Sequence, residues 1–139
     1  MNGLIKPQAL KKGDKIASFD DTILFIETSE EKPAPVQLVY WLRNFAAQGI
    51  LNRVKGILMG RPGGEFKPEE QEKQDDFILS YKAYDEAVLK VLDEFEINIP
   101  VVTCMDFGHT LPQFILPYGA LAKIDPFEKR VLILEGAVE

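Results

Sequence analysis

The chain has 139 residues, a length typical of a single domain with one hydrophobic core. Its net charge of −6 argues against a nucleic-acid partner, because phosphate binding requires a basic surface. No apolar segment is long enough to span a bilayer, the first residues lack the apolar stretch of a signal peptide, and one cysteine permits no internal disulfide bond. We therefore expect a cytoplasmic globular protein with no nucleic-acid and no membrane partner.

The first half of the chain alternates between apolar runs and an amphipathic segment. Residues 15–17 are expected to pair as an additional strand, and the short apolar run 23–26 predicts a buried strand of a parallel sheet. The prolines within 33–35 favour the start of a helix, and apolar residues then recur over 36–48. A second strand is expected over 54–59.

The second half begins with residues 65–76, which are rich in acids and lysines and predict a solvated loop or a frayed helix start. Apolar residues then recur at helical spacing, and the stripe that they form consists of Tyr81, Tyr84, Val88, Val91, Leu92 and Phe95. Strands are expected over 99–105, 114–124 and 131–134, with a turn at 125–129. This order predicts an α/β domain with a mainly parallel sheet, flanking helices and a C-terminal β-hairpin.

Two side chains with catalytic chemistry are expected at one edge of this sheet. Glu27 directly follows the first strand, and His109, the only histidine, follows the third strand on a glycine-flanked turn. Because the carboxyl ends of parallel strands meet at one edge, we expect the two side chains to lie together there. A carboxylate that accepts a hydrogen bond from an imidazole N–H fixes the ring tautomer, which supplies two members of a nucleophile–histidine–acid triad.

Other interpretations of these residues remain open. A lone histidine in a turn is more often a packed or solvent-facing side chain than a catalytic one, and the cluster Glu27, Glu30 and Glu31 would ordinarily be a solvated turn. Asp106 competes with Glu27 as the partner of His109. One histidine with scattered acids gives weak support for zinc, so we expect no metal and no cofactor.

The same reasoning finds no nucleophile. None of the serines lies in the small-residue elbow that presents a catalytic serine between a strand and a helix; these serines are Ser18, Ser29 and Ser80. Cys104 falls within an apolar strand, which predicts an inert buried thiol rather than a reactive one.

Several blocks of the sequence, in order, resemble the LD-carboxypeptidase family of serine peptidases. The blocks are ILFIETSEEKP from Ile23, VKGILMGR from Val54, DFGHTLP from Asp106 and LPYGALAKID from Leu116. The ETSEEKP segment is similar to the branch that includes the microcin C self-immunity proteins. The resemblance covers residues 22–135 and implies the fold of the family's C-terminal domain.

The resemblance also implies a Ser–Glu–His triad in which Glu27 is the acid and His109 the base. In the family the serine precedes the glutamate, yet here residues 1–17 are similar to the extreme N-terminus of the family and run directly into Ser18. This implies two parts: a remnant of the family's N-terminus over 1–17 and a single C-terminal-type domain over 18–139. The domain that carries the nucleophile would be missing between them.

The family activity implied is hydrolysis of an amide bond next to a terminal residue, in a muropeptide during peptidoglycan recycling or in a peptidyl-nucleotide antibiotic or similar acyl-sulfamoyl or acyl-phosphoramidate compound. The serine would attack the carbonyl, His109 would move the proton and Glu27 would orient His109. Without the serine we expect this chain to be inactive alone. Two alternatives are a non-catalytic binding domain that forms a homo-oligomer through an exposed apolar surface, and a nucleophile supplied by a separate polypeptide.

Overall fold

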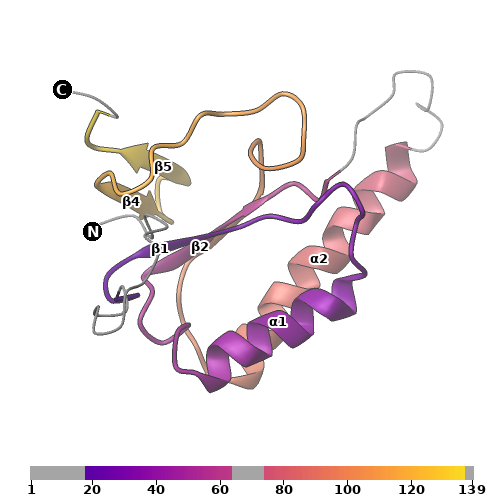
Figure 1. Cartoon of the computed structure of the whole chain (residues 1–139), viewed down its shortest axis with the longest axis horizontal. Helices are drawn as coiled ribbons and strands as arrows, with labels where there is room; N and C mark the ends of the chain where they lie inside the picture. The colour runs from indigo at the N-terminus through magenta and orange to yellow at the C-terminus, as the bar shows by residue number, and fades with distance from the viewer. Residues whose placement is uncertain (1–17, 64–73, 137–139) are drawn as a thin grey trace, which may run out of the picture.

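The computed structural model describes residues 18–63 and 74–136, with the backbone alone for 74–80. A parallel three-stranded sheet carries two helices and is followed by an antiparallel hairpin, which confirms the predicted α/β class (Figure 1). The elements in chain order are β1 (Ile23–Ile26), α1 (Pro35–Ala47), β2 (Gly56–Gly60), α2 (Gln74–Glu94), β3 (Val101–Met105), β4 (Ala122–Asp125) and β5 (Arg130–Ile133).

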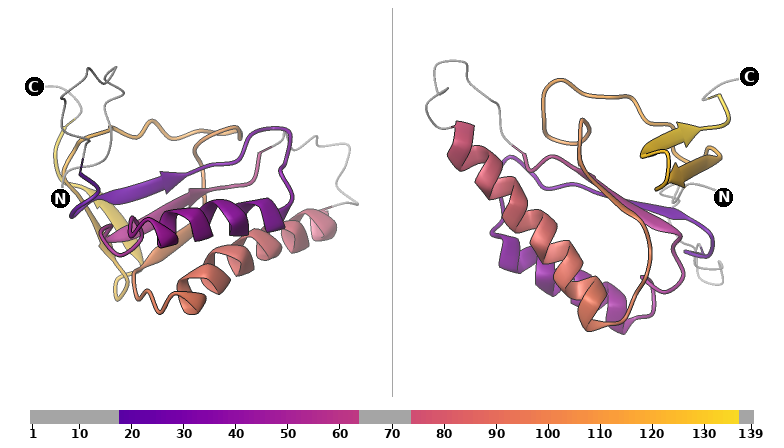
Figure 2. Two further views of the ribbon diagram at one scale, coloured as in Figure 1. Left: turned by 60° about the horizontal axis from the view of Figure 1, so that its bottom comes forward. Right: turned by 180° about the vertical axis from the view of Figure 1, so that it is seen from behind.

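The strand order in the sheet is β1-β2-β3, so each new parallel strand is added on the same side of the previous one. Crossovers between parallel strands are right-handed, and two such crossovers in one direction place both connecting helices on the same face. Figures 1 and 2 show α1 and α2 side by side on one face of the sheet, with the β4–β5 hairpin beyond the other face. The helices therefore cover one face of the sheet, and the hairpin and its loops lie on the side of the other face.

Side chains of the strands alternate between two hydrophobic cores, as the period of two in a strand requires. In β1, Leu24 and Ile26 pack in the helix-side core, whereas Ile23 and Phe25 pack on the hairpin side. Leu58 of β2 is fully buried and joins the hairpin-side core. Every residue of the central strand β2 is buried, so this strand connects the two cores.

Each helix buries one face. The residues that fill the helix-side core are Leu38, Val39, Leu42 and Ala46 of α1 and Tyr84, Ala87, Val88, Val91 and Leu92 of α2. The apolar Tyr40 and Trp41 of α1 are exposed, as is Phe95 after the end of α2. Helix α1 ends before Gly49, whose φ of +73° reverses the chain. Among the helices that the structure describes, none has the length and apolar character needed to cross a membrane.

The strand predicted over 114–124 is wrong in its first part, because β4 begins only at Ala122. Pro117 has no N–H to donate to a strand ladder, and Gly119 adopts a φ of +82° that turns the chain. The residues before β4 therefore form a loop, and Ile115 within it is 97% exposed. Other large apolar side chains of this loop are exposed as well, among them Phe114 and Tyr118.

The interpretation of Cys104 as a buried thiol is also wrong, because its side chain is exposed. The register between β2 and β3 shifts, with Leu58 opposite Val102 but Gly60 opposite Met105. The additional residue in β3 forms a bulge, and Cys104 takes a φ of +56° there. A bulge reverses the alternation of side chains in the part of the strand that follows it. The period of two in the sequence therefore cannot predict which of those later residues are buried.

Two predicted segments lie largely or wholly outside the described residues. Helix α2 begins at Gln74, within the range 65–76 for which a loop or frayed helix start was expected. The remainder of that range lies outside the described residues, as does the strand expected over 15–17.

We predict that Leu58→Ala lowers the free energy of unfolding by about 3 kcal/mol, because it leaves a cavity where β2 meets the hairpin-side core. Leu89→Ala is the matched control: Leu89 is 56% exposed on α2, and its truncation should change stability by less than about 0.5 kcal/mol. Urea unfolding followed by circular dichroism measures both variants. Equal losses for the two would contradict the buried position of Leu58.

Candidate active site

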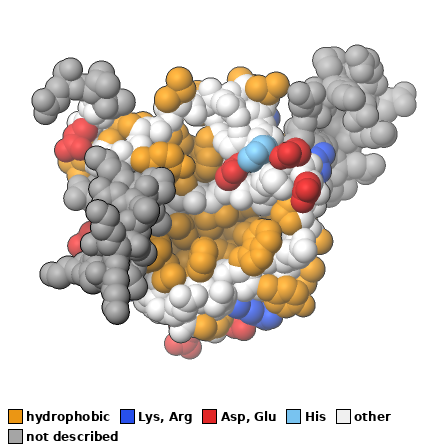
Figure 3. All heavy atoms as spheres, in the orientation of Figure 1, with side chains coloured by type: hydrophobic (Ala, Val, Ile, Leu, Met, Phe, Trp, Pro, Cys, Tyr) orange, Lys and Arg blue, Asp and Glu red, His pale blue; other side chains and the backbone are white. Residues whose placement is uncertain are grey.

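Three loops meet where the strands of the parallel sheet end. Because Ile26 pairs with Met59 and Gly60 pairs with Met105, the carboxyl ends of β1, β2 and β3 lie level with one another. Glu27 directly follows β1, and His109 lies in the loop after β3. Figure 3 shows the single histidine among acidic side chains, beside apolar surface.

The two residues predicted from the sequence are brought into direct contact. Nδ1 of His109 lies 2.7 Å from Oε2 of Glu27, and the backbone N–H of His109 donates a hydrogen bond of 3.0 Å to the same oxygen. A carboxylate in this position requires Nδ1 to carry a hydrogen and leaves Nε2 as the nitrogen that faces away from Glu27. Glu27 therefore fixes both the backbone and the ring of His109.

A glycine next to the histidine permits this close approach. Gly108 has a φ of +87°, and a Cβ placed there would lie 2.8 Å from Cβ of Glu27 and overlap its Oε2. A similar restriction applies one strand away, where a Cβ on Gly60 would lie 2.5 Å from the carbonyl oxygen of Phe107. The loop after β3 thus reaches Glu27 only because these two positions have no side chain.

Asp106 pairs with an arginine and not with the histidine. Nη2 of Arg61 lies 2.6 Å from Oδ1 of Asp106 and donates a hydrogen bond of 3.0 Å to the carbonyl of Leu111. The backbone N–H of Arg61 donates to the carbonyl of Met105 at 2.9 Å. Arg61 therefore holds the chain on both sides of His109. Sequence reasoning missed this role, although an arginine directly after β2 was a signal for a side chain at the same sheet edge.

The loops after β1 and β2 are connected as well. The buried hydroxyl of Thr28 accepts a hydrogen bond of 3.1 Å from the backbone N–H of Gly63. A Cβ on Gly63 would lie 2.5 Å from the carbonyl oxygen of Ser29, so the two loops are in backbone contact. All three loops are therefore tied together around Glu27.

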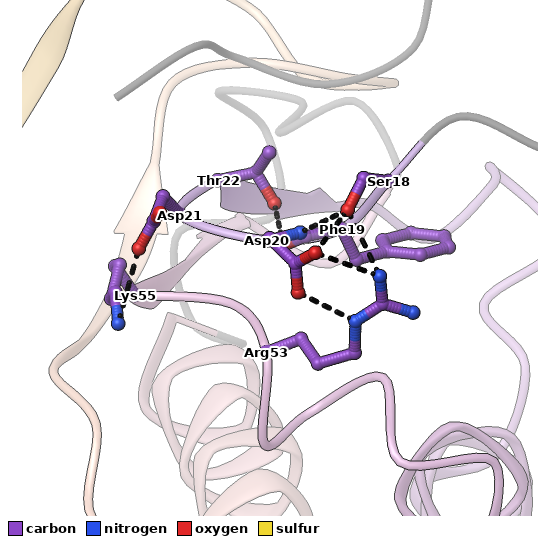
Figure 4. Close-up of polar contacts among 7 residues, drawn as sticks. All are labelled: Ser18, Phe19, Asp20, Asp21, Thr22, Arg53 and Lys55. Atoms are coloured by element: carbon purple, nitrogen blue, oxygen red, sulfur yellow. Dashed lines mark hydrogen bonds and ion pairs between the residues drawn. The ribbon is translucent and has the colours of Figure 1, made fainter.

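Ser18, the serine nearest to the family's expected position upstream of Glu27, belongs to a different cluster. It precedes β1, whereas Glu27 follows that strand, and its Oγ lies 2.5 Å from Oδ2 of Asp20. Arg53 donates to the Ser18 hydroxyl at 2.9 Å and to Oδ1 of Asp20 at 2.7 Å (Figure 4). The Arg53 guanidinium holds the pKa of Asp20 far below its usual range. This cluster fixes the chain at the start of β1 and lies at the opposite end of the strand from His109.

The second ring nitrogen of His109 also faces a carboxylate. Nε2 lies 3.4 Å from Oε2 of Glu30, whose side chain is 70% exposed. The hydrogen bond to Glu27, followed by the charge of Glu27 and then that of Glu30, raises the pKa of His109 above its ordinary 6.5. The cluster of acids is thus only partly the solvated turn that its sequence suggests, since two of its members contact the imidazole.

Two hollows flank Glu27. One has a volume of 240 Å³ and a mostly apolar lining of Phe25, Glu27, Phe107, Gly108, Phe114, Leu116 and Tyr118. The other has a volume of 490 Å³ and a more polar lining of Glu27, Thr28, Ser29, Glu31, Lys32, Pro33, Ala34, Gln37 and Trp41. A molecule bound across Glu27 would therefore meet an aromatic surface on one side and polar groups on the other. Among the described residues, no three His, Cys, Asp or Glu side chains are grouped to hold a metal ion.

We predict that Glu27→Gln lowers the pKa of His109 toward 6.5, because the variant removes the charge that stabilises the imidazolium. NMR titration is unambiguous here because the chain has one histidine. The pKa of His109 is raised in the folded state, so its contact with Glu27 stabilises the folded protein fully below pH 6.5. This stabilisation is lost as the pH rises through the folded-state pKa of His109. A titration unchanged by Glu27→Gln would contradict the contact.

Comparison with known proteins identifies the family and the fold of this chain. A family model of the LD-carboxypeptidase C-terminal domain matches residues 7–124. The solved structure of an MccF-like protein from Streptococcus pneumoniae in complex with AMP has 32% sequence identity and a TM-score of 0.62, and the match covers 83% of this chain and 29% of that one. No curated protein sequence matches the chain at a significant level.

Structures of the microcin C7 self-immunity protein MccF share the fold. The inactive mutant without ligand has 23% identity and a TM-score of 0.63, covering 88% of this chain and 33% of that one. The complex with glutamyl sulfamoyl guanosine has the same identity and TM-score and covers 88% of this chain and 32% of that one. This chain thus spans roughly a third of the length of the solved proteins that it matches. Because the family model matches most of its length, the chain belongs to the LD-carboxypeptidase family, and the part matched is that family's C-terminal domain.

Proposed function

We propose that this chain supplies the acid and the base of a serine-peptidase triad, Glu27 and His109, to a nucleophile that lies outside it. The observation that carries this proposal is the pair of contacts from His109 to one oxygen of Glu27, 2.7 Å from Nδ1 and 3.0 Å from the backbone nitrogen. This geometry leaves Nε2 as the nitrogen that accepts a proton from a nucleophile. Of the serines whose side chains are described, Ser18 and Ser29, neither is hydrogen-bonded to His109.

In the proposed reaction a serine hydroxyl approaches Nε2 of His109 and attacks the carbonyl carbon of an amide. His109 takes the hydroxyl proton and then donates it to the leaving amine, while Glu27 stabilises the imidazolium. Only the neutral imidazole can accept the proton. Activity should therefore rise with pH through the raised pKa of His109.

The substrate class that we propose is a peptidyl nucleotide or a related acyl-sulfamoyl nucleoside. Relatives of this chain have been solved with AMP, with glutamyl sulfamoyl guanosine and with aspartyl sulfamoyl adenosine. In this chain, Phe25 packs edge-on against Phe107 and Tyr118 with ring centroids 5.7 Å apart, beside Glu27. An aromatic surface of this kind suits a planar base, which favours the nucleotide class over a muropeptide of peptidoglycan recycling.

We further propose that the chain is divided into a family-type N-terminal remnant over 1–17 and a C-terminal-type domain over 18–139, and that it is located in the cytoplasm. The nucleophile domain would reach His109 from another polypeptide or from a further part of a longer protein. Either source explains why the isolated chain should be inactive.

The test is a chimera in which residues 18–136 of this chain replace the matching part of the pneumococcal MccF-like protein. We expect the chimera to hydrolyse aspartyl sulfamoyl adenosine and the isolated chain to show no hydrolysis. His109→Ala and Glu27→Ala should each reduce the chimera's kcat by at least about 100-fold. Asp93→Asn, an exposed acid of α2 away from the site, should leave kcat unchanged. A folded but inactive chimera, or hydrolysis by the isolated chain, would contradict the proposal.

A second candidate function, a self-associating domain without chemistry, is favoured by the apolar side chains of the loop after His109. Leu111, Phe114, Ile115 and Tyr118 have exposed fractions between 61% and 97%. Large contiguous apolar surfaces are uncommon on monomers and often mark an interaction site. The same loop lines the hollow beside Glu27 through Phe114 and Tyr118, so an association surface and the candidate site adjoin each other.

We predict that the chain forms dimers or larger homo-oligomers at high concentration and that Ile115→Ser weakens this association by about tenfold, because it removes one fully exposed apolar side chain from the surface. Phe127→Ser is the control, since Phe127 is 95% exposed but lies in the turn between β4 and β5. Sedimentation velocity over a concentration series measures both. A strictly monomeric wild-type chain would rule out self-association through this loop.

A further inference from the structure

The imidazole of His109 lies between two carboxylates that come from the same loop. Glu27 contacts Nδ1 at 2.7 Å, and Glu30 contacts Nε2 at 3.4 Å. The contact of Glu27 with Nδ1 is favourable in both protonation states of the ring, because Nδ1 carries a hydrogen in both. The contact of Glu30 with Nε2 is favourable in only one of these states.

A neutral imidazole with its hydrogen on Nδ1 has a lone pair on Nε2. That lone pair repels a carboxylate oxygen, whereas the N–H of an imidazolium attracts it. A carboxylate at Nε2 therefore stabilises the protonated ring, which cannot act as a base. In a triad, moreover, Nε2 is the atom that a nucleophile's hydroxyl must reach.

Taking the proposed function as its basis, we propose that Glu30 shifts His109 toward its protonated, non-basic form by about threefold and is displaced from Nε2 when a nucleophile docks. Glu30 is then a positioning residue that acts through His109 and does not touch the substrate. On displacement, the imidazolium loses this stabilisation, so a larger fraction of rings releases the Nε2 proton to solvent and can take the hydroxyl proton during attack on the carbonyl.

The surroundings of the ring support a role for this particular acid. Among the described residues of the three loops at this edge, the charged ones near the ring are Glu27, Glu30, Glu31 and Lys32 after β1, Arg61 after β2, and Asp106 before His109. Arg61 and Asp106 are paired with each other at 2.6 Å. Glu30 is 70% exposed and makes a longer contact than Glu27, so it can leave at small cost while Glu27 stays in place.

The test is an NMR titration of His109 in Glu30→Gln and in Glu31→Gln. The second variant removes the same charge from the next residue, and Glu31 makes no contact with His109. We expect Glu30→Gln to lower the titration midpoint by about half a pH unit at low salt and less at high salt, whereas Glu31→Gln leaves it unchanged. A wild-type midpoint in Glu30→Gln, or equal shifts in both variants, would overturn the proposal.

The active chimera provides a second readout, which distinguishes displacement of Glu30 from a permanent contact. Because the docked nucleophile domain should already displace Glu30, Glu30→Gln should leave the chimera's acid limb of kcat against pH unshifted, although it lowers the NMR midpoint of the isolated chain. An acid limb that shifts by the same amount as that midpoint would overturn the displacement of Glu30. If Glu30→Gln lowers the midpoint of the isolated chain while the folded chimera is inactive, the proposed function fails and the protonating contact of Glu30 is supported.

Discussion

Oε2 of Glu27 accepts two hydrogen bonds from a residue far along the chain, one from the backbone and one from the ring of His109. Much of the surrounding structure serves to let these groups meet. Gly108 removes the side chain that would overlap the carboxylate, and Arg61 holds the loop after β3 through Asp106 and Leu111. Because one oxygen receives both donors, a shift of the loop would break both bonds together, so the backbone path and the ring orientation are coupled.

The parallel sheet supplies the frame for this contact. Its strands end level with one another, and both helices lie on one face, so the hairpin side of the site remains uncovered by helices. The bulge at Cys104 adds a residue to β3 just before the loop that carries His109. Bulges often redirect a strand near a functional site, and here one lies immediately before the loop that must reach Glu27.

The position of Glu27 and His109 at one edge could be predicted from a general rule, that side chains following parallel strands meet at one edge. The choice of Glu27 over Asp106 as the partner of His109 came from the family resemblance. Other features could not be predicted because they depend on particular three-dimensional neighbours. The burial of Cys104 was misjudged because the bulge changes the alternation of side chains in β3. The roles of Arg61 and Glu30 depend on which loop residue each faces, and nothing in a local sequence pattern contains that information.

The exposed position of Glu27 and His109 connects the proposed catalytic function with the proposed self-association. Glu27 and His109 are 40% and 49% exposed, and the apolar loop with Ile115 borders them. Water weakens the attraction between a carboxylate and an imidazolium, so burial by a docked surface would strengthen the stabilisation that Glu27 gives to the imidazolium formed during the attack. Under the proposed function, a nucleophile domain that covers this loop would also exclude water from Glu27 and His109 and displace the exposed Glu30. The apolar surface that favours association would then be the surface that completes the site, so docking and activation would be the same event.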